Sequence, residues 1–147
     1  MSQSPNLQAP RIAVVDDDPE LLKLIGMLLG RIGAESHMFA DGEDILRYLE
    51  TASPDLIIID LMLPDINGYD ILRHIRSQNR FNEVPVLILS ARADPSSIRR
   101  GLDEGADGYV TKPYIANSLI DRVRLLLSQG RQSKPTAQLQ QDDFPLE

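Results

Sequence analysis

Three short apolar runs, rich in β-branched residues, constrain the fold of this chain more than any other feature. They lie at 12–15, 57–59 and 86–89, and none of them alternates with polar residues. This pattern is typical of strands that are buried on both faces, as in parallel sheets covered by helices on both sides. Two weaker strand candidates lie at 35–39 and 108–111.

Segments with helical periodicity separate these runs. The segment 19–30 carries leucine and isoleucine at helical spacing, with Asp18 as a candidate helix cap and Pro19 at the first helical position. Four further segments have the same character, at 43–50, 68–78, 95–104 and 115–127. Five strands that alternate with five helices predict an α/β domain, a doubly wound five-stranded parallel sheet with right-handed crossovers.

Composition limits the other possibilities. The 147 residues are enough for one domain with a real core, and we expect it at 11–128. Residues 1–10 and 129–147 are rich in Gln, Ser and Pro without a hydrophobic period, so we expect a flexible N-terminal segment and a flexible tail or linker. The tail is too short to fold as an effector domain, so the chain is either a stand-alone protein or part of a longer one.

The charge balance and the residues that are missing exclude several kinds of site. A net charge of −7 argues against a broad basic surface for direct nucleic-acid binding, and the absence of cysteine excludes disulfides and thiolate metal sites. No signal peptide and no apolar run of membrane-spanning length is present, so we expect a cytoplasmic protein without membrane contact. No glycine-rich phosphate loop is present, which argues against a nucleotide enzyme.

Polar residues follow four of the predicted strands, at the sheet edge where such folds bind ligands. They are Asp16, Asp17 and Asp18 after the first strand, Asp60 after the third, Ser90 after the fourth and Lys112 after the fifth. Crowded carboxylates repel unless a cation lies among them, and ligands that are all oxygen suit Mg2+. Asp60 is therefore a candidate nucleophile for a phosphoryl group, whose oxygens Ser90 and Lys112 could contact.

Four motifs in order carry a resemblance to a known family: V-V-D-D-D at 14–18, I-I-I-D-L-M-L-P-D-I-N-G at 57–68, L-S-A at 89–91 and G-A-D-G-Y-V-T-K-P at 105–113. With them the chain resembles the receiver domain of two-component response regulators over essentially all of 11–128. The resemblance implies a flavodoxin-like (βα)5 fold with strand order 2-1-3-4-5. It also implies a phosphoprotein of phosphorelay signal transduction, whose phosphodonor is a sensor histidine kinase or a phosphotransfer protein.

The resemblance also implies a role for each candidate residue. Asp60 would be the phosphoacceptor, and Mg2+ would be held by Asp16, Asp17, Asp60 and the backbone carbonyl of Met62. Ser90 and Tyr109 would be the switch residues, and Lys112 would lie beside the phosphoryl group. The Lys112–Pro113 peptide bond would be cis. Such a domain is no enzyme beyond self-dephosphorylation.

Other interpretations stay open. One alternative is a Mg2+-dependent phosphohydrolase with Asp60 as its nucleophile, although every loop is too short for a substrate-covering lid. Another is a receiver that binds partners without being phosphorylated. His37 and His74 are interpreted as surface or partly buried side chains, since they lack the spacing of metal ligands.

The resemblance places signal output on the face formed by 95–127, where several DNA-binding regulators dimerise through alternating charges. Here Gly108 and Ser118 stand where acidic residues would be expected. Because exposed ion pairs contribute only about 0–1 kcal/mol each, losing two weakens such a dimer. We therefore predict a monomer, or a weak homodimer that tightens on phosphorylation. The output partner is not evident from the sequence.

Overall fold

Five parallel strands form one sheet in the computed structural model, which describes residues 8–112 and 116–131. The strands are β1 (Arg11–Val15), β2 (Glu35–Phe39), β3 (Leu56–Ile59), β4 (Val86–Ser90) and β5 (Gly108–Thr111). Their order across the sheet is β2-β1-β3-β4-β5, and each neighbouring pair is parallel. The predicted flavodoxin-like α/β fold and its strand order are confirmed.

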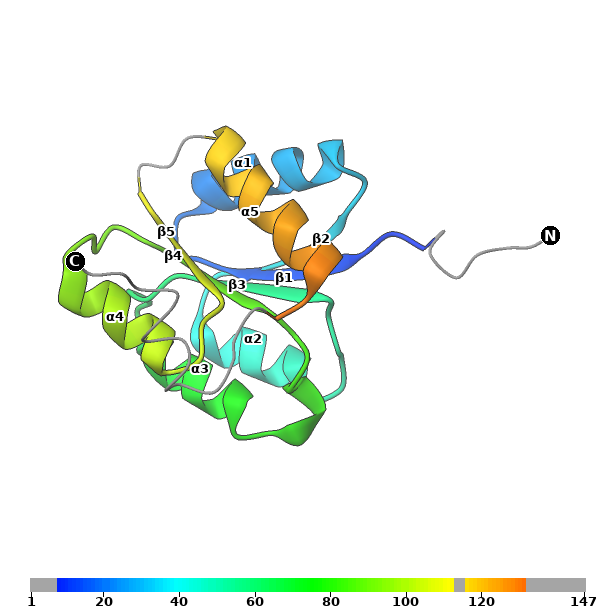
Figure 1. The fold of residues 1–147 in the computed structure, drawn as a ribbon. Coiled ribbons are helices and arrows are strands. Elements are labelled where there is room, and N and C mark those ends of the chain that lie inside the picture. The colour runs from blue at the N-terminus through cyan, green and yellow to red at the C-terminus, as the bar shows by residue number, and fades with distance from the viewer. Residues whose placement is uncertain (1–7, 113–115, 132–147) are drawn as a thin grey trace.

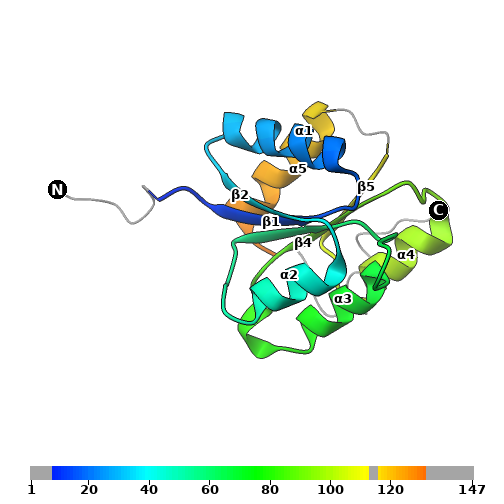
Figure 2. The same cartoon turned by 180° about the vertical axis from the view of Figure 1, so that it is seen from behind.

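Helices cover both faces of this sheet (Figures 1 and 2). They are α1 (Pro19–Arg31), α2 (Gly42–Leu49), α3 (Gly68–Arg76), α4 (Pro95–Asp103) and α5 (Ala116–Gln129). Helices α1 and α5 lie on one face, and α2, α3 and α4 lie on the other. The helix limits differ from the predicted ones by one or two residues, where helix ends fray. A short 3-10 helix, η2 (Asn79–Phe81), was not predicted.

The continuous apolar runs are explained by two separate cores. In β3, Ile57 and Ile59 point into the core beneath α2 and α3, whereas Ile58 points into the core beneath α1 and α5. Successive side chains of a strand face opposite sides of the sheet, so a sheet buried on both sides needs apolar residues at every position. All four side chains of β3 are buried for this reason.

The helix starts explain why the loops above the sheet are short and ordered. The Asp18 carboxylate accepts hydrogen bonds from the backbone N–H groups of Glu20 (3.0 Å) and Leu21 (3.4 Å), which confirms its predicted role as the cap of α1. Asp41, Asn67 and Asp94 cap α2, α3 and α4 in the same way. The loops that precede α1, α2, α3 and α4 therefore each end in a capped helix start.

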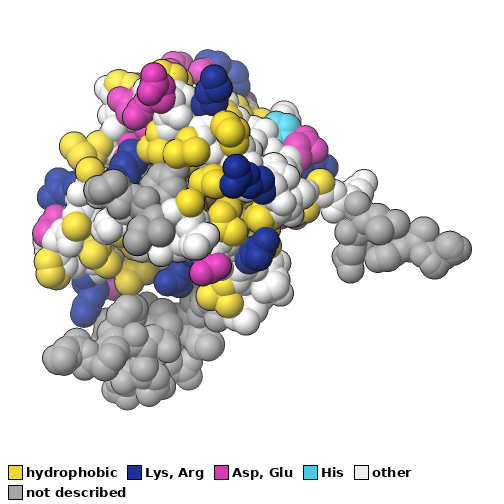
Figure 3. Space-filling model, turned by 90° about the horizontal axis from the view of Figure 1, so that it is seen from above, with side chains coloured by type: hydrophobic (Ala, Val, Ile, Leu, Met, Phe, Trp, Pro, Cys, Tyr) yellow, Lys and Arg dark blue, Asp and Glu magenta, His cyan; other side chains and the backbone are white. Residues whose placement is uncertain are grey.

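One face of the surface carries charges of both signs (Figure 3). Seen from the side of α1 and α5, Lys and Arg side chains are scattered among acidic and apolar ones (Figure 3). Among the described residues, no helix is both long and apolar enough to cross a membrane. The prediction for the Lys112–Pro113 bond, most of the two predicted terminal segments and the start of the last predicted helix at residue 115 lie outside the described residues. The domain limits 11–128 stay a prediction.

Candidate functional site

The strand register brings three aspartates together at the carboxyl edge of the sheet. Val15 pairs with Ile59, so Asp16 and Asp60, the residues that follow them, lie side by side. Carboxylate oxygens of Asp16, Asp17 and Asp60 lie within 4.8 Å of one another. The first and last of these side chains are buried and Asp17 is exposed. The cluster is therefore open to solvent on the Asp17 side.

Lys112 lies between the two buried carboxylates. Its ammonium nitrogen is 2.8 Å from Oδ2 of Asp16 and 3.0 Å from Oδ2 of Asp60. It reaches them because Ser90 pairs with Thr111 at the end of β5, and the Lys112 N–H then bonds the Ser90 carbonyl (2.8 Å). One cation thus serves two buried anions.

These contacts shift the pKa values of Asp60 and Lys112. Burial raises the pKa of Asp60, and the charge of Asp16 adds to this, whereas bonds from Met62 and Lys112 act in the opposite direction. Burial by itself would lower the pKa of Lys112, but its hydrogen bonds and attraction to the two carboxylates outweigh burial and raise it. A second cation at this site would therefore favour the ionised form of Asp60.

The loop between β3 and α3 fixes the backbone beside Asp60. The Met62 N–H donates to Oδ1 of Asp60 (3.1 Å). At Gly68 an added Cβ would lie 2.6 Å from the Asp60 carbonyl oxygen, so only glycine allows α3 to start this close to β3. The Asp65 carboxylate accepts from the N–H groups of Gly42 and Glu43 (both 2.9 Å) at the start of α2. Asp65 was not predicted as part of this edge, because its partners lie more than twenty residues away along the chain.

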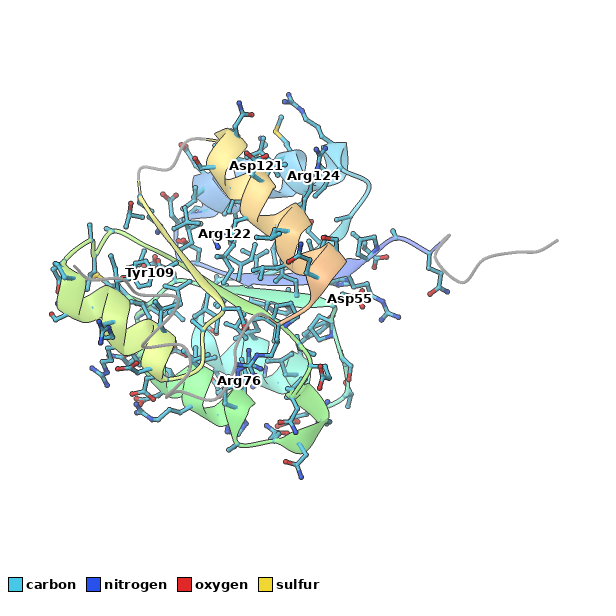
Figure 4. All side chains as sticks on the ribbon, in the orientation of Figure 1. Asp55, Arg76, Tyr109, Asp121, Arg122 and Arg124 are labelled. Carbon is cyan, nitrogen blue, oxygen red and sulfur yellow. The ribbon has the colours of Figure 1, made fainter. Side chains whose placement is uncertain are left out.

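Ser90 and Tyr109 are joined through the backbone of Arg92. The Ser90 side chain is fully buried, and its hydroxyl oxygen accepts from the Arg92 N–H (3.1 Å). The Tyr109 hydroxyl donates to the Arg92 carbonyl (2.6 Å). Burial raises the pKa of this phenol, and a hydrogen bond with the Ser90 side chain acts in the opposite direction. The ring of Tyr109 packs against α4, where a Cβ at Gly101 would lie 3.3 Å from it (Figure 4). Arg92 was not predicted because a backbone carbonyl leaves no trace in the sequence.

A groove of about 420 Å³ opens beside the acidic cluster. Asp17 and Arg92 line it together with apolar side chains of the loop that follows Asp60. Through Asp17, this groove reaches the exposed side of the acidic cluster.

The donor set fits a hard divalent cation. Three carboxylates within 4.8 Å of one another supply only oxygen, and the one exposed member leaves room for water ligands. Mg2+ binds in this way, through one or two carboxylates plus waters and phosphate oxygens. The Met62 backbone lies next to Asp60, and its carbonyl as a further ligand stays a prediction.

Comparison with known proteins gives a consistent answer. The family model described as the response regulator receiver domain matches residues 12–124. The DNA-binding response regulator MtrA of Mycolicibacterium smegmatis is 36% identical over 137 residues, which are 93% of this chain and 58% of that protein. The transcriptional regulatory protein BaeR of Escherichia coli is 36% identical over 134 residues, 91% of this chain and 53% of that protein. The chain thus spans about half the length of the curated relatives it matches.

Solved structures agree with the sequence relatives. The BeF3-activated receiver domain of DrrB, a Thermotoga maritima protein, superposes with a TM-score of 0.76 at 36% identity, covering 82% of this chain and 99% of that domain. The superposition thus covers nearly the whole of that receiver domain.

Proposed function

Since the chain belongs to the response regulator receiver domain family, we propose that it accepts a phosphoryl group on Asp60 from a partner histidine kinase or phosphotransfer protein. One observation carries the assignment to this residue. Asp60 is a buried carboxylate at the end of the central strand β3, within 4.8 Å of two other carboxylates and 3.0 Å from an ammonium group. A buried carboxyl group with a raised pKa, clustered with other charged groups beside an open groove, is typical of a reactive site.

In the proposed transfer, a carboxylate oxygen of Asp60 attacks the phosphorus atom of a phosphohistidine. The new P–O bond gives an aspartyl phosphate, the P–N bond breaks, and its electron pair stays on the imidazole nitrogen, which then takes up a proton. Lys112 offsets the added negative charge, because its ammonium already lies within hydrogen-bond distance of Asp60. The Ser90 hydroxyl is the proposed donor to a phosphoryl oxygen.

Asp16, Asp17 and Asp60, with the carbonyl of Met62, would hold Mg2+ at this edge. When bound, the ion supplies positive charge against the phosphoryl oxygens. Lys112 contributes a positive charge from the chain itself, and its ammonium group contacts both buried carboxylates before transfer.

The proposed output follows from the Arg92 contacts. A hydroxyl of Ser90 that turns toward a phosphoryl group changes the 90–92 backbone, to which the Tyr109 hydroxyl is bonded. Tyr109 in turn contacts α4, so the change reaches the face formed by α4, β5 and α5. We propose that an output partner binds this face, that the protein is a monomer or a weak phosphorylation-dependent homodimer, and that it works in the cytoplasm.

Intact-mass measurement after treatment with a small phosphodonor and Mg2+ tests the assignment. We expect one phosphate per chain, which Asp60→Asn abolishes. Asp55→Asn is the matched control, because Asp55 precedes the same strand at its other end (Figure 4) and accepts a bond from the Arg11 N–H. Undiminished labelling of Asp60→Asn would disprove the assignment. Many product equivalents per chain, from a small phosphate ester, would favour the phosphohydrolase instead.

A further inference from the structure

A second buried charge cluster lies at the amino edge of the sheet, at the opposite end from Asp60. Its centre is Asp107, which directly precedes β5 and whose side chain has no exposed surface. Oδ2 of Asp107 accepts from the N–H of Val86 at the start of β4 (2.9 Å) and from the guanidinium of Arg76 (2.9 Å). These contacts hold the starts of β4 and β5 to the end of α3.

A second guanidinium reaches the same carboxylate from beyond the last helix. Nε of Arg131 is 3.0 Å from Oδ1 of Asp107. Its two other nitrogens each donate to a backbone carbonyl at 3.3 Å, one of Asn82 and one of Gly105. Arg131 therefore bonds to the segment after η2, to the turn between α4 and β5, and to the start of β5.

The turn that brings Arg131 into this position depends on Gly130. This residue has φ +72°, in the left-handed region, and its N–H bonds the carbonyl of Leu126 (2.8 Å) at the end of α5. Glycine adopts this conformation without steric cost and commonly ends helices in this way. The chain after α5 thus turns back onto the domain, and Arg131 is the first residue after that turn.

Arg76 already serves as a buried partner of Asp107. It also donates to the carbonyls of Gly105 (3.0 Å) and Phe81 (2.9 Å), so its place in the core is fixed without Arg131. Burial, together with the charge of Arg131, lowers the pKa of Arg76 to about 10. The second guanidinium thus repels the first while it attracts Asp107, and its three contacts fix the position of the chain that carries it.

We propose that Arg131 and Asp107 form an anchor that fixes the point where the chain leaves the domain after α5. Any segment that follows Arg131 then starts from a set position at the amino edge of β4 and β5, far from Asp60. The group that binds Asp107 here is the guanidinium of Arg131, a residue of the same chain. The anchor rests on contacts that are independent of the phosphoryl chemistry at the other edge.

A nitroxide label next to Arg131 tests the anchor in the full chain. The protein contains no cysteine, so Gln132→Cys provides a single labelling position. We expect slow label motion by electron paramagnetic resonance, and a rotational correlation time at least threefold shorter when Arg131→Gln is added. Arg124→Gln is the matched control, because Arg124 lies exposed on α5 (Figure 4), and it should leave the label motion unchanged. Equal motion with and without Arg131 would overturn the proposal.

Hydrogen exchange separates an anchor from an ordinary core ion pair. In Arg131→Gln, the Gly130 amide should exchange at least tenfold faster, because its bond to Leu126 depends on the turn. The Val86 amide should stay within twofold, since Asp107 still accepts from it and Arg76 still binds Asp107. A matching loss of protection at both amides would show that Arg131 stabilises the whole core and would contradict a local anchor.

Discussion

Replacing Lys112 with methionine tests the charge balance on which the candidate site depends. The change removes the ammonium group and keeps a side chain of similar length, so Asp16 and Asp60 lose two hydrogen bonds of 2.8 and 3.0 Å. Both carboxylates are almost fully buried, with side-chain exposures of 2% and 4%, while that of Lys112 is 22%. Two anions would then face each other without the cation that lies between them.

The expected cost follows from these contacts. Removing one partner of a buried ion pair destabilises a protein by about 3–5 kcal/mol. Because Lys112 is partly exposed, we expect the lower end, about 3 kcal/mol at pH 7 without divalent ions. The pKa of Lys112 is raised by its partners, so in the native protein this stabilisation is fully present below the unfolded pKa and is lost as pH rises through the folded one. In the variant, lowering the pH protonates one carboxylate and reduces the loss.

Mg2+ should act differently on the two proteins. In the variant no ammonium competes for the Oδ2 atoms of Asp16 and Asp60, so Mg2+ affinity should rise at least tenfold. At a Mg2+ concentration of one hundred times the Kd of the variant, the variant gains about 2.7 kcal/mol and the native protein, with a tenfold higher Kd, gains about 1.4 kcal/mol, so Mg2+ should narrow the difference in stability by about 1.3 kcal/mol. Urea unfolding followed by circular dichroism, with and without Mg2+ at constant ionic strength, measures both effects.

Lys23→Met is the matched control, because Lys23 is exposed on α1, and surface changes are usually within about 0.5 kcal/mol. If the Lys112 variant unfolds at the same urea concentration as the native protein, the two ion pairs do not contribute to stability. If Mg2+ leaves the difference unchanged, the ammonium and the metal ion do not share ligands. Either result refutes the reasoning.

Three further predictions concern other residues. Asp18→Ala should cost about 0.5–2 kcal/mol of stability as the loss of a helix cap, whereas Asp17→Ala should mainly weaken Mg2+ binding in calorimetry; the reverse pattern would mean that the acidic triplet is assigned in the wrong register. Hydrogen bonds from Ser96 and Ser97 lower the pKa of Asp94 to about 2, so the stability it adds is present above its unfolded pKa and is lost as pH falls toward 2. The difference in unfolding free energy between the native protein and Asp94→Asn should accordingly shrink from pH 5 to pH 2, and a constant difference would contradict it. In sedimentation we expect a monomer that forms at most a weak dimer with a phosphoryl mimic and does not respond in Asp60→Asn; a tight dimer in both proteins would refute this.

The sheet and its site could be predicted because short stretches of sequence identify the strands, and the parallel arrangement of the strands then determines which residues meet. β-branched runs identify buried strands, and parallel strands bring the residues that follow them to one edge. Asp16 and Asp60 follow neighbouring strands, so their contact follows once the strand order is known. The same logic brings Lys112 to Ser90 at the ends of β5 and β4.

Contacts that join a side chain to a distant backbone group could not be predicted. Asp65 binds the start of α2, and Tyr109 binds the carbonyl of Arg92, and no residue type marks either partner. Arg131 lies 24 residues from Asp107 in a stretch whose composition resembles a linker. A polar composition shows that a segment lacks a core of its own, but one long side chain can still bind it to a neighbouring domain.

The two charge clusters at opposite edges of the sheet differ in the number of cations for each buried carboxylate. At the carboxyl edge one ammonium serves Asp16 and Asp60, and burial and mutual repulsion raise the pKa of Asp60. At the amino edge Asp107 receives two guanidiniums and a backbone N–H. Binding of a further cation can therefore stabilise the carboxyl edge, whereas the charge of Asp107 at the amino edge is already balanced by its two guanidinium partners. Burial alone does not distinguish them, because all three carboxylates are buried. The shortage of positive charge beside Asp60 is what suits that edge to bind a metal ion, and the surplus of donors at Asp107 is what suits the other to hold the chain in place.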